Sequence, residues 1–233
     1  MNFGKLFEGG STEHENQELA KKEEYAQTRS SKITEKIDEG NIKKAMEIFT
    51  NNFFKKGYDQ ETQILTENHV IPFVKEKIIG DINNRKGDEL VKMIDGFHSY
   101  LRNGDMEEVV EFIKPDDLKQ IPEDTLKSPE IVEKIKSYLV NDCEKHLHPN
   151  HYGIFKHMLE RFSKLGFVSE EEIIKSPEIK EVARKKLVES IKNGPKEGLI
   201  RNIIPEFEKL KKVILELGIL DEEEVKQIKD GEK

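Results

Sequence analysis

The chain has 233 residues, of which 35% are hydrophobic and 37% charged, and its formal net charge is −8. An average globular protein has roughly 45–50% and 25% of these classes. This composition excludes one thick spherical core and predicts thin layers of helices that each bury one stripe. Alternation of Val, Ile or Thr with polar residues is almost absent, so we expect an all-α fold. We do not expect a nucleic-acid partner, because phosphate binding usually requires a basic excess.

Cysteine usage and hydropathy predict the compartment. The single Cys143 excludes a disulfide within the chain and suits a reducing environment. No stretch approaches the roughly 18 uncharged apolar residues of a membrane span. Residues 1–10 include Lys5 and Glu8 and lack the apolar core of a signal peptide. We therefore expect a cytoplasmic protein without a membrane span.

Residues 1–29 are polar and charged. Thr12 and Glu15 have the spacing of a helix capping box. The following residues offer only a thin apolar stripe that includes Leu19 and Tyr25. Such a helix has little to bury, so we expect either a flexible arm or a single loosely docked helix. A helical domain then covers residues 30–233.

Three similar blocks predict the turns of αα-hairpins. In each block an apolar residue and two polar ones precede Gly40, Gly104 or Gly194. Glycine tolerates the left-handed conformation that ends a helix, and the Asn, Asp or Pro that follows starts the next one. A further helix is predicted near residues 106–113.

A second block follows the hairpins. Gly166 and Gly218 each end a helix and precede a short acidic segment, and Ser-Pro-Glu at 128–130 and 176–178 starts a long helix. These blocks recur at intervals of roughly 48 and 52 residues, which is typical of helical repeats. Because the spacing drifts, the sequence predicts an irregular, α-solenoid-like array of αα-hairpin repeats.

Apolar residues recur at helical spacing between these blocks. This periodicity is typical of helices that pack on one side. The predicted core positions are Phe155, Met158, Phe162 and Leu165; Phe207, Leu210, Ile214 and Leu217; and Leu90, Ile94, Phe97 and Leu101.

The segments Ile-Lys-Ser-Pro-Glu-Ile, at 174–179, and Gly-Phe-Val-Ser-Glu-Glu-Glu-Ile, at 166–173, resemble units of uncharacterised bacterial helical-repeat proteins. The resemblance covers residues 30 to 225 through the repeat pattern alone. It implies a helical-repeat fold, and it implies neither an activity nor catalytic residues.

One cluster of side chains is a candidate metal site. The only cysteine and four of the seven histidines fall within one predicted hairpin: Cys143, His146, His148, His151 and His157. Sulfur and imidazole donors from two helices and their joint could converge on a tetrahedral Zn²⁺. The alternative is a small buried cysteine beside a solvated loop, and the spacing matches no standard zinc knuckle.

A basic face is the other candidate. It comprises Arg184, Lys185, Lys186, Lys209, Lys211 and Lys212. Such a face would serve a nucleic-acid-associated factor, whereas most charge runs are solvated surfaces that form weak pairs along a helix.

The familiar catalytic signatures are missing from the sequence: phosphate-binding loops, the dinucleotide fingerprint, G-x-S-x-G and H-E-x-x-H. The leading hypothesis is therefore a non-enzymatic interaction or scaffold protein that binds a protein or peptide partner on its helical surface. A zinc protein and a nucleic-acid-associated factor are the alternatives.

Overall fold

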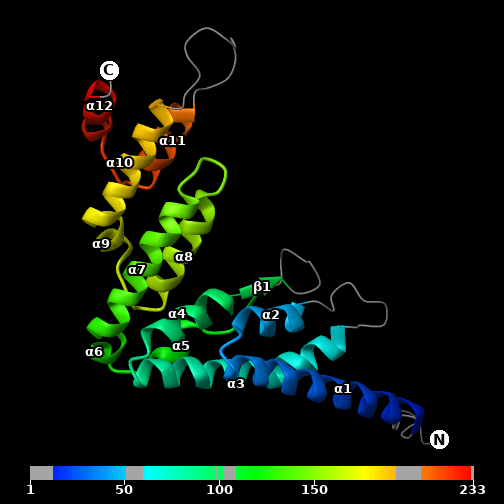
Figure 1. The fold of residues 1–233 in the computed structure, drawn as a ribbon. Coiled ribbons are helices and arrows are strands. Elements are labelled where there is room, and N and C mark those ends of the chain that lie inside the picture. Colours follow the sequence, from blue (N-terminus) through cyan, green and yellow to red (C-terminus); the bar gives the residue numbers. More distant parts are fainter. Residues whose placement is uncertain (1–12, 51–59, 98, 102–108, 193–205, 232–233) are drawn as a thin grey trace, which may run out of the picture. The chain divides into compact units, whose positions relative to one another are not determined.

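The computed structural model describes residues 13–50, 60–97, 99–101, 109–192 and 206–231 (Figure 1). The elements are α1 (Glu13–Asp38), α2 (Ile42–Thr50), α3 (Gln60–Asn83), α4 (Gly87–Gly96), β1 (Ser99–Leu101), β2 (Val109–Glu111), α5 (Pro115–Leu118), α6 (Glu123–Leu126), α7 (Pro129–His146), α8 (Tyr152–Lys164), α9 (Glu170–Ile174), α10 (Pro177–Lys192), α11 (Glu206–Glu216) and α12 (Glu222–Gly231). The predicted all-α class is confirmed, since the two strands have three residues each and form one antiparallel hairpin. None of the described helices is long and apolar enough to cross a membrane.

The chain divides into two compact units. Unit 1 consists of Met1–Ile78 and Lys92–Ile113, and unit 2 consists of Ile79–Val91 and Lys114–Lys233. Both α3 and α4 contribute residues to the two units. The predicted boundary at residue 30 lies inside α1, which runs without a break from Glu13 to Asp38. Thr12, the predicted cap of that helix, lies outside the described residues.

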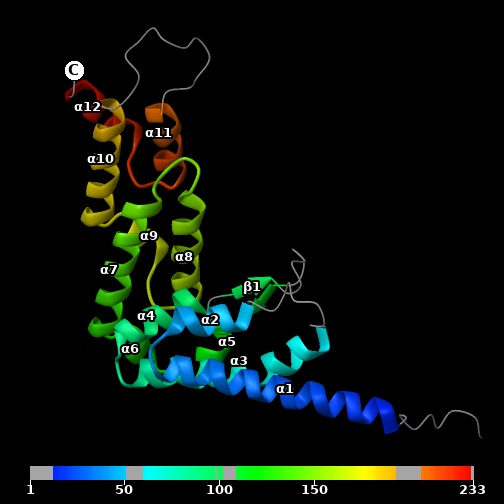
Figure 2. The ribbon, with the colours of Figure 1, turned by 45° about the vertical axis from the view of Figure 1, so that its right-hand side comes forward.

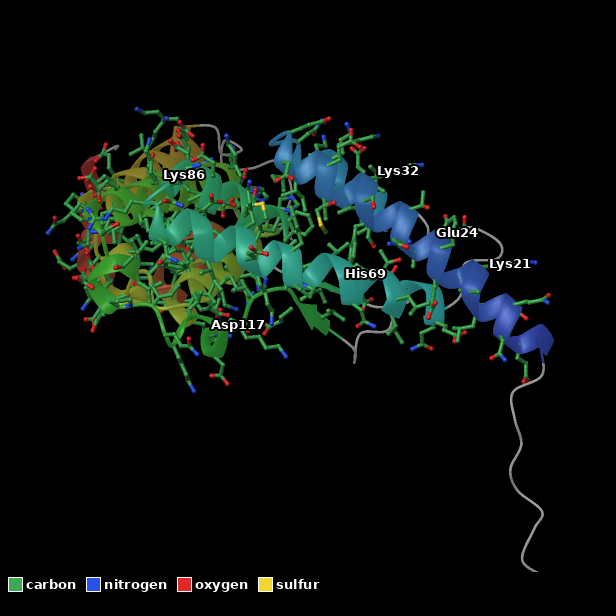
Figure 3. All side chains as sticks on the ribbon, turned by 90° about the horizontal axis from the view of Figure 1, so that it is seen from below. Lys21, Glu24, Lys32, His69, Lys86 and Asp117 are labelled. Atoms are coloured by element: carbon green, nitrogen blue, oxygen red, sulfur yellow. The ribbon has the colours of Figure 1, made fainter. Side chains whose placement is uncertain are left out.

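Two ion pairs show that α1 and α3 run in the same direction in unit 1 (Figure 3). Lys22 pairs with Glu61 at 2.8 Å, and Lys77 pairs with Asp38 at 3.3 Å. Both pairs join residues that are 39 positions apart, so the two helices are parallel and in register.

A buried arginine joins α1 to the end of α2. Arg29 is only 4% exposed, and its guanidinium donates hydrogen bonds to the backbone oxygens of Ile48, at 2.7 Å, and Phe49, at 2.6 Å. The last carbonyls of a helix have no partner within the helix. Arg29 therefore caps the carboxyl end of α2, where the helix dipole also favours a cation.

Three phenylalanines form the aromatic core of unit 1. The ring of Phe112 packs edge-on against Phe49, at a centroid distance of 5.2 Å, and against Phe97, at 5.1 Å. All three side chains are fully buried. The predicted turn between α1 and α2 is confirmed, because Gly40 has a φ of 73° and Asn41 Oδ1 accepts the backbone N–H of Lys44.

The predictions around residues 97–113 are wrong in two places. Residues 109–113, the described part of the helix predicted at 106–113, do not form a helix, since Val109–Glu111 is strand β2. Leu101 is not in a helix either: α4 ends at Gly96, and Leu101 pairs with Val109 in the hairpin. The β-branched Val109 and Val110 favour a strand, because helical packing restricts their side chains. Gly104, with the turn predicted there, lies outside the described residues, as does Gly194.

In unit 2, two helix pairs follow one another, α7 with α8 and α10 with α11 (Figures 1 and 2). The helix α10 contacts α7, α11 and α12, and the short α9 contacts α8 and α10. The predicted Ser-Pro-Glu starts are confirmed, since α7 begins at Pro129 and α10 at Pro177. Ser128 occupies the N-cap position of α7, but its side chain makes no capping hydrogen bond.

The two pairs have matching buried positions. In α7 the buried Ile131, Ile135 and Leu139 correspond to Ile179, Ala183 and Leu187, which are buried 48 positions further on in α10. In α8 and α11 the offset is 52 positions. The buried residues there are Phe155, Met158, Phe162 and Leu165, and Phe207, Leu210, Ile214 and Leu217.

The ends of α8 and α11 match as well. Gly166 has a φ of 87° and Gly218 a φ of 70°. In both cases the backbone N–H of the next residue, Phe167 or Ile219, donates back to a carbonyl of the helix that has just ended. Both glycines therefore end a helix as predicted.

Candidate functional site

Cys143 lies on the buried side of α7. Its side chain is fully buried, and burial, with a smaller effect from the neighbouring Asp142 carboxylate, raises the pKa of the thiol to about 12. A zinc ligand must be a thiolate. Without a bound cation, burial therefore keeps Cys143 as the neutral thiol.

His146 and His148 lie at the end of α7, and each is near a carboxylate. His146 Nε2 is 3.5 Å from Oδ1 of Asp142. His148 Nδ1 accepts the backbone N–H of Asn150 at 3.2 Å, and its Nε2 is 3.4 Å from Oε1 of Glu206. Since Nδ1 accepts this bond, a neutral His148 carries its proton on Nε2.

Among the five predicted ligands, all of them described, the structure places the rings of His148 and His151 near each other. The rings of His148 and His151 lie 5.6 Å apart, Cys143 is buried in α7, and His157 is exposed on α8. Within the described residues, no group of three or more His, Cys, Asp or Glu side chains is arranged to hold a metal ion. Zinc binding remains a prediction, and metal analysis of untagged protein tests it: less than a tenth of an equivalent of zinc would contradict it.

Glu206 is the partner that the sequence analysis missed. It is the first residue of α11 and lies 58 positions after His148. Acidic residues are common in the first turn of a helix because of the dipole. No local pattern distinguishes this one as the partner of a histidine in another helix.

Half of the predicted basic face is engaged in ion pairs. Arg184 pairs with Glu224 at 3.0 Å, Lys185 with Glu144 at 3.1 Å and Lys211 with Glu222 at 2.9 Å. Each carboxylate offsets the charge that a phosphate would need. These pairs weaken the case for a nucleic-acid surface.

Glu224 also fixes the start of α12. Its side chain accepts the backbone N–H of Asp221, while Asp221 accepts the backbone N–H of Glu224, which is a reciprocal capping box. The Asp221 N–H, followed by Lys180 and Arg184, holds the pKa of Glu224 below its ordinary value. The carboxylate thus connects α12 to two cations of α10.

An open groove of about 1070 Å³ lies along α7, α9 and the start of α10, and we call it the α7–α9 groove. Val140 and Pro177 supply exposed apolar surface, and charged and polar side chains make up most of the remaining lining. Lys136 of α7 and Glu172 of α9 form an ion pair across it at 2.5 Å. The groove was not predicted, because its lining comes from segments that are far apart in the sequence.

A second groove occurs at the matching positions. The α10–α12 groove has a volume of about 580 Å³ and includes Val188, which is 48 positions after Val140. The ion pair is repeated too, since Arg184 and Glu224 correspond to Lys136 and Glu172.

No family model, curated protein or solved structure matches this chain. Its function therefore has to be inferred from its own residues.

Proposed function

We propose that the chain is a non-enzymatic protein-interaction module, in which an irregular array of αα-hairpin repeats offers a groove to a segment of a partner protein. The α7–α9 groove carries this proposal. Its volume of about 1070 Å³ slightly exceeds the roughly 300–1,000 Å³ typical of small-molecule sites. Such a groove accommodates several consecutive residues of a peptide.

The matching of the two helix pairs supports the repeat part of the proposal. Buried positions, helix ends and an ion pair recur at offsets of 48 and 52 positions. Repeat proteins stack such units and use the resulting extended surface to bind partners.

Site-specific photo-crosslinking tests the proposal. A benzoylphenylalanine in place of Ser137, an exposed residue of the groove, should crosslink one partner protein in a lysate of the source organism. The same group in place of Lys156, which is exposed on α8 and does not line the groove, is the matched control.

The crosslinked protein is then purified and mixed with the unmodified chain. We expect a complex of defined stoichiometry that Ser137→Lys weakens. Equal crosslinking from both positions, or no complex between the purified proteins, would contradict the proposal.

A further inference from the structure

The charges of the α7–α9 groove do not balance. Its lining contains two lysines and four glutamates. Lys136 pairs with Glu172, and Lys175 pairs with Glu171, both at 2.5 Å. Four of the six charges are thereby neutralised within the groove.

The remaining two charges are Glu133, on α7, and Glu178, in the first turn of α10. Both are exposed, and among the described residues neither forms an ion pair with a Lys, Arg or His. They line the same groove as the apolar Val140 and Pro177. The groove thus combines apolar surface with two carboxylates that form no ion pair among the described residues.

The excess of negative charge in the α7–α9 groove does not recur in the matching α10–α12 groove. In the α10–α12 groove, Val188 stands at the position of Val140, and Glu181 stands at the position of Glu133. Lys185, however, stands at the position of Ser137. The lining of the second groove includes three cations and two carboxylates: Arg184, Lys185 and Lys192, and Glu181 and Glu189.

We propose that the α7–α9 groove binds a partner segment in which an apolar side chain is flanked by Lys or Arg. The apolar side chain would contact Val140 and Pro177, and the flanking cations would meet Glu133 and Glu178. Complementary charge at the rim of an interface selects the correct partner and suppresses like-charged ones. This inference rests on the proposed function and specifies the chemistry of the partner.

Selection from a library of random peptides tests the preference. Phage-displayed 12-residue peptides are selected on the full chain, and the enriched sequences are synthesised and titrated by fluorescence anisotropy. We expect sequences with Lys or Arg beside an apolar residue. The double variant Glu133→Lys/Glu178→Lys should bind them at least about tenfold more weakly and should select acidic flanks instead.

The second groove supplies a matched pair of variants. Ser137→Lys introduces the cation that the α10–α12 groove has at this position and should also weaken binding. Lys185→Ser makes the reverse change and should leave it unaltered. All of these positions are exposed, and circular dichroism confirms that each variant is folded.

The outcomes separate this inference from the proposed function. If Ser137→Lys weakens binding of the selected peptides, but their flanking residues are acidic or neutral, the charge preference is wrong. The groove would then still be the binding site. If Lys185→Ser weakens peptide binding as much as Ser137→Lys does, the assignment of the peptide to the α7–α9 groove would be overturned. Failure to enrich any peptide, or a dimer of the chain that Ser137→Lys dissociates, would also overturn the inference.

Discussion

Cys143 continues the buried stripe of α7, four positions after Leu139. The sequence suggested two roles for it, a metal ligand or a small apolar side chain. Its complete burial and its raised pKa are those of the second role. At the scale of single residues, burial therefore favours the second role, which residue type alone does not distinguish from the first.

We expect Cys143 to be unreactive in the folded protein. With a thiol pKa of about 12, almost no thiolate exists at pH 8, and burial prevents access. A thiol reagent such as Ellman's should label the cysteine only after urea unfolds the chain. Rapid labelling of one thiol per chain without denaturant would contradict this prediction.

The same pKa predicts a loss of stability at alkaline pH. Above pH 9 the unfolded chain releases the thiol proton, whereas the folded chain retains it up to a pH of about 12. The stabilisation is therefore complete below pH 9 and declines as the pH rises towards 12. The free energy of unfolding in urea is measured for the wild type and for Cys143→Ala at pH 8 and pH 10.5. It should fall less between the two pH values in the variant than in the wild type.

Arg29 should contribute strongly to the stability of unit 1. Arg29→Met leaves the carbonyls of Ile48 and Phe49 buried without this donor, and we expect a loss of about 3 kcal/mol in the free energy of unfolding. Lys32→Met is the control, because Lys32 is exposed on the side of α1 that faces away from α3 (Figure 3). Urea unfolding should show a change within about 0.5 kcal/mol for the control. Equal effects of the two substitutions would contradict the capping role.

At the scale of elements, the clearest regularity is the common ending of α8 and α11. Gly166 and Gly218 have positive φ values, and a Cβ added at either would meet nothing within 4 Å. The left-handed backbone conformation, and no contact with another part of the chain, therefore favours glycine at these positions.

We expect Gly166→Ala and Gly218→Ala to cost the same, about 1–2 kcal/mol each, because both force an L-residue into the left-handed region. Gly153→Ala is the control: it also has open space, but it lies within α8 and has no positive φ. That substitution should stabilise the protein by about 0.5–1 kcal/mol. A large difference between the first two variants in urea unfolding would show that the two helix ends are not equivalent.

Helix boundaries marked by glycine, proline or acidic residues could be predicted from the sequence, because these residues act through the local backbone. The turn at Gly40 and the starts of α7 and α10 are examples. The β1–β2 hairpin was missed, because each strand has only three residues and gives too short an alternation to recognise. Apolar residues near Leu101 and Ile113 fit a helical period well enough to conceal it.

The candidate site could not be predicted, because it depends on contacts between distant segments. Lys136 and Glu172 are 36 positions apart, and either of them alone is an ordinary surface residue. The repeat array, the partner and the zinc site remain predictions.

At the scale of the whole molecule, the net charge of −8 and the pairing of the basic residues with carboxylates both reduce the attraction of phosphate groups. We expect no complex with a 30-nucleotide RNA or a DNA duplex of similar length at micromolar protein and 50 mM salt, because the overall field repels phosphate. An electrophoretic mobility shift assay checks this. A shift that disappears steeply as salt increases would contradict it.

The offsets of 48 and 52 positions also bear on where the chain accepts extra length. Ser190, which is buried, follows its counterpart Asp142 by 48 positions, whereas Phe207 follows its counterpart Phe155 by 52. The four additional residues therefore lie in the sequence between α10 and α11. The matching positions in α10 and in α11 remain buried despite this change of offset. This connection is therefore a natural insertion point, where an epitope tag or a fluorescent peptide can be placed without shifting a helix out of register.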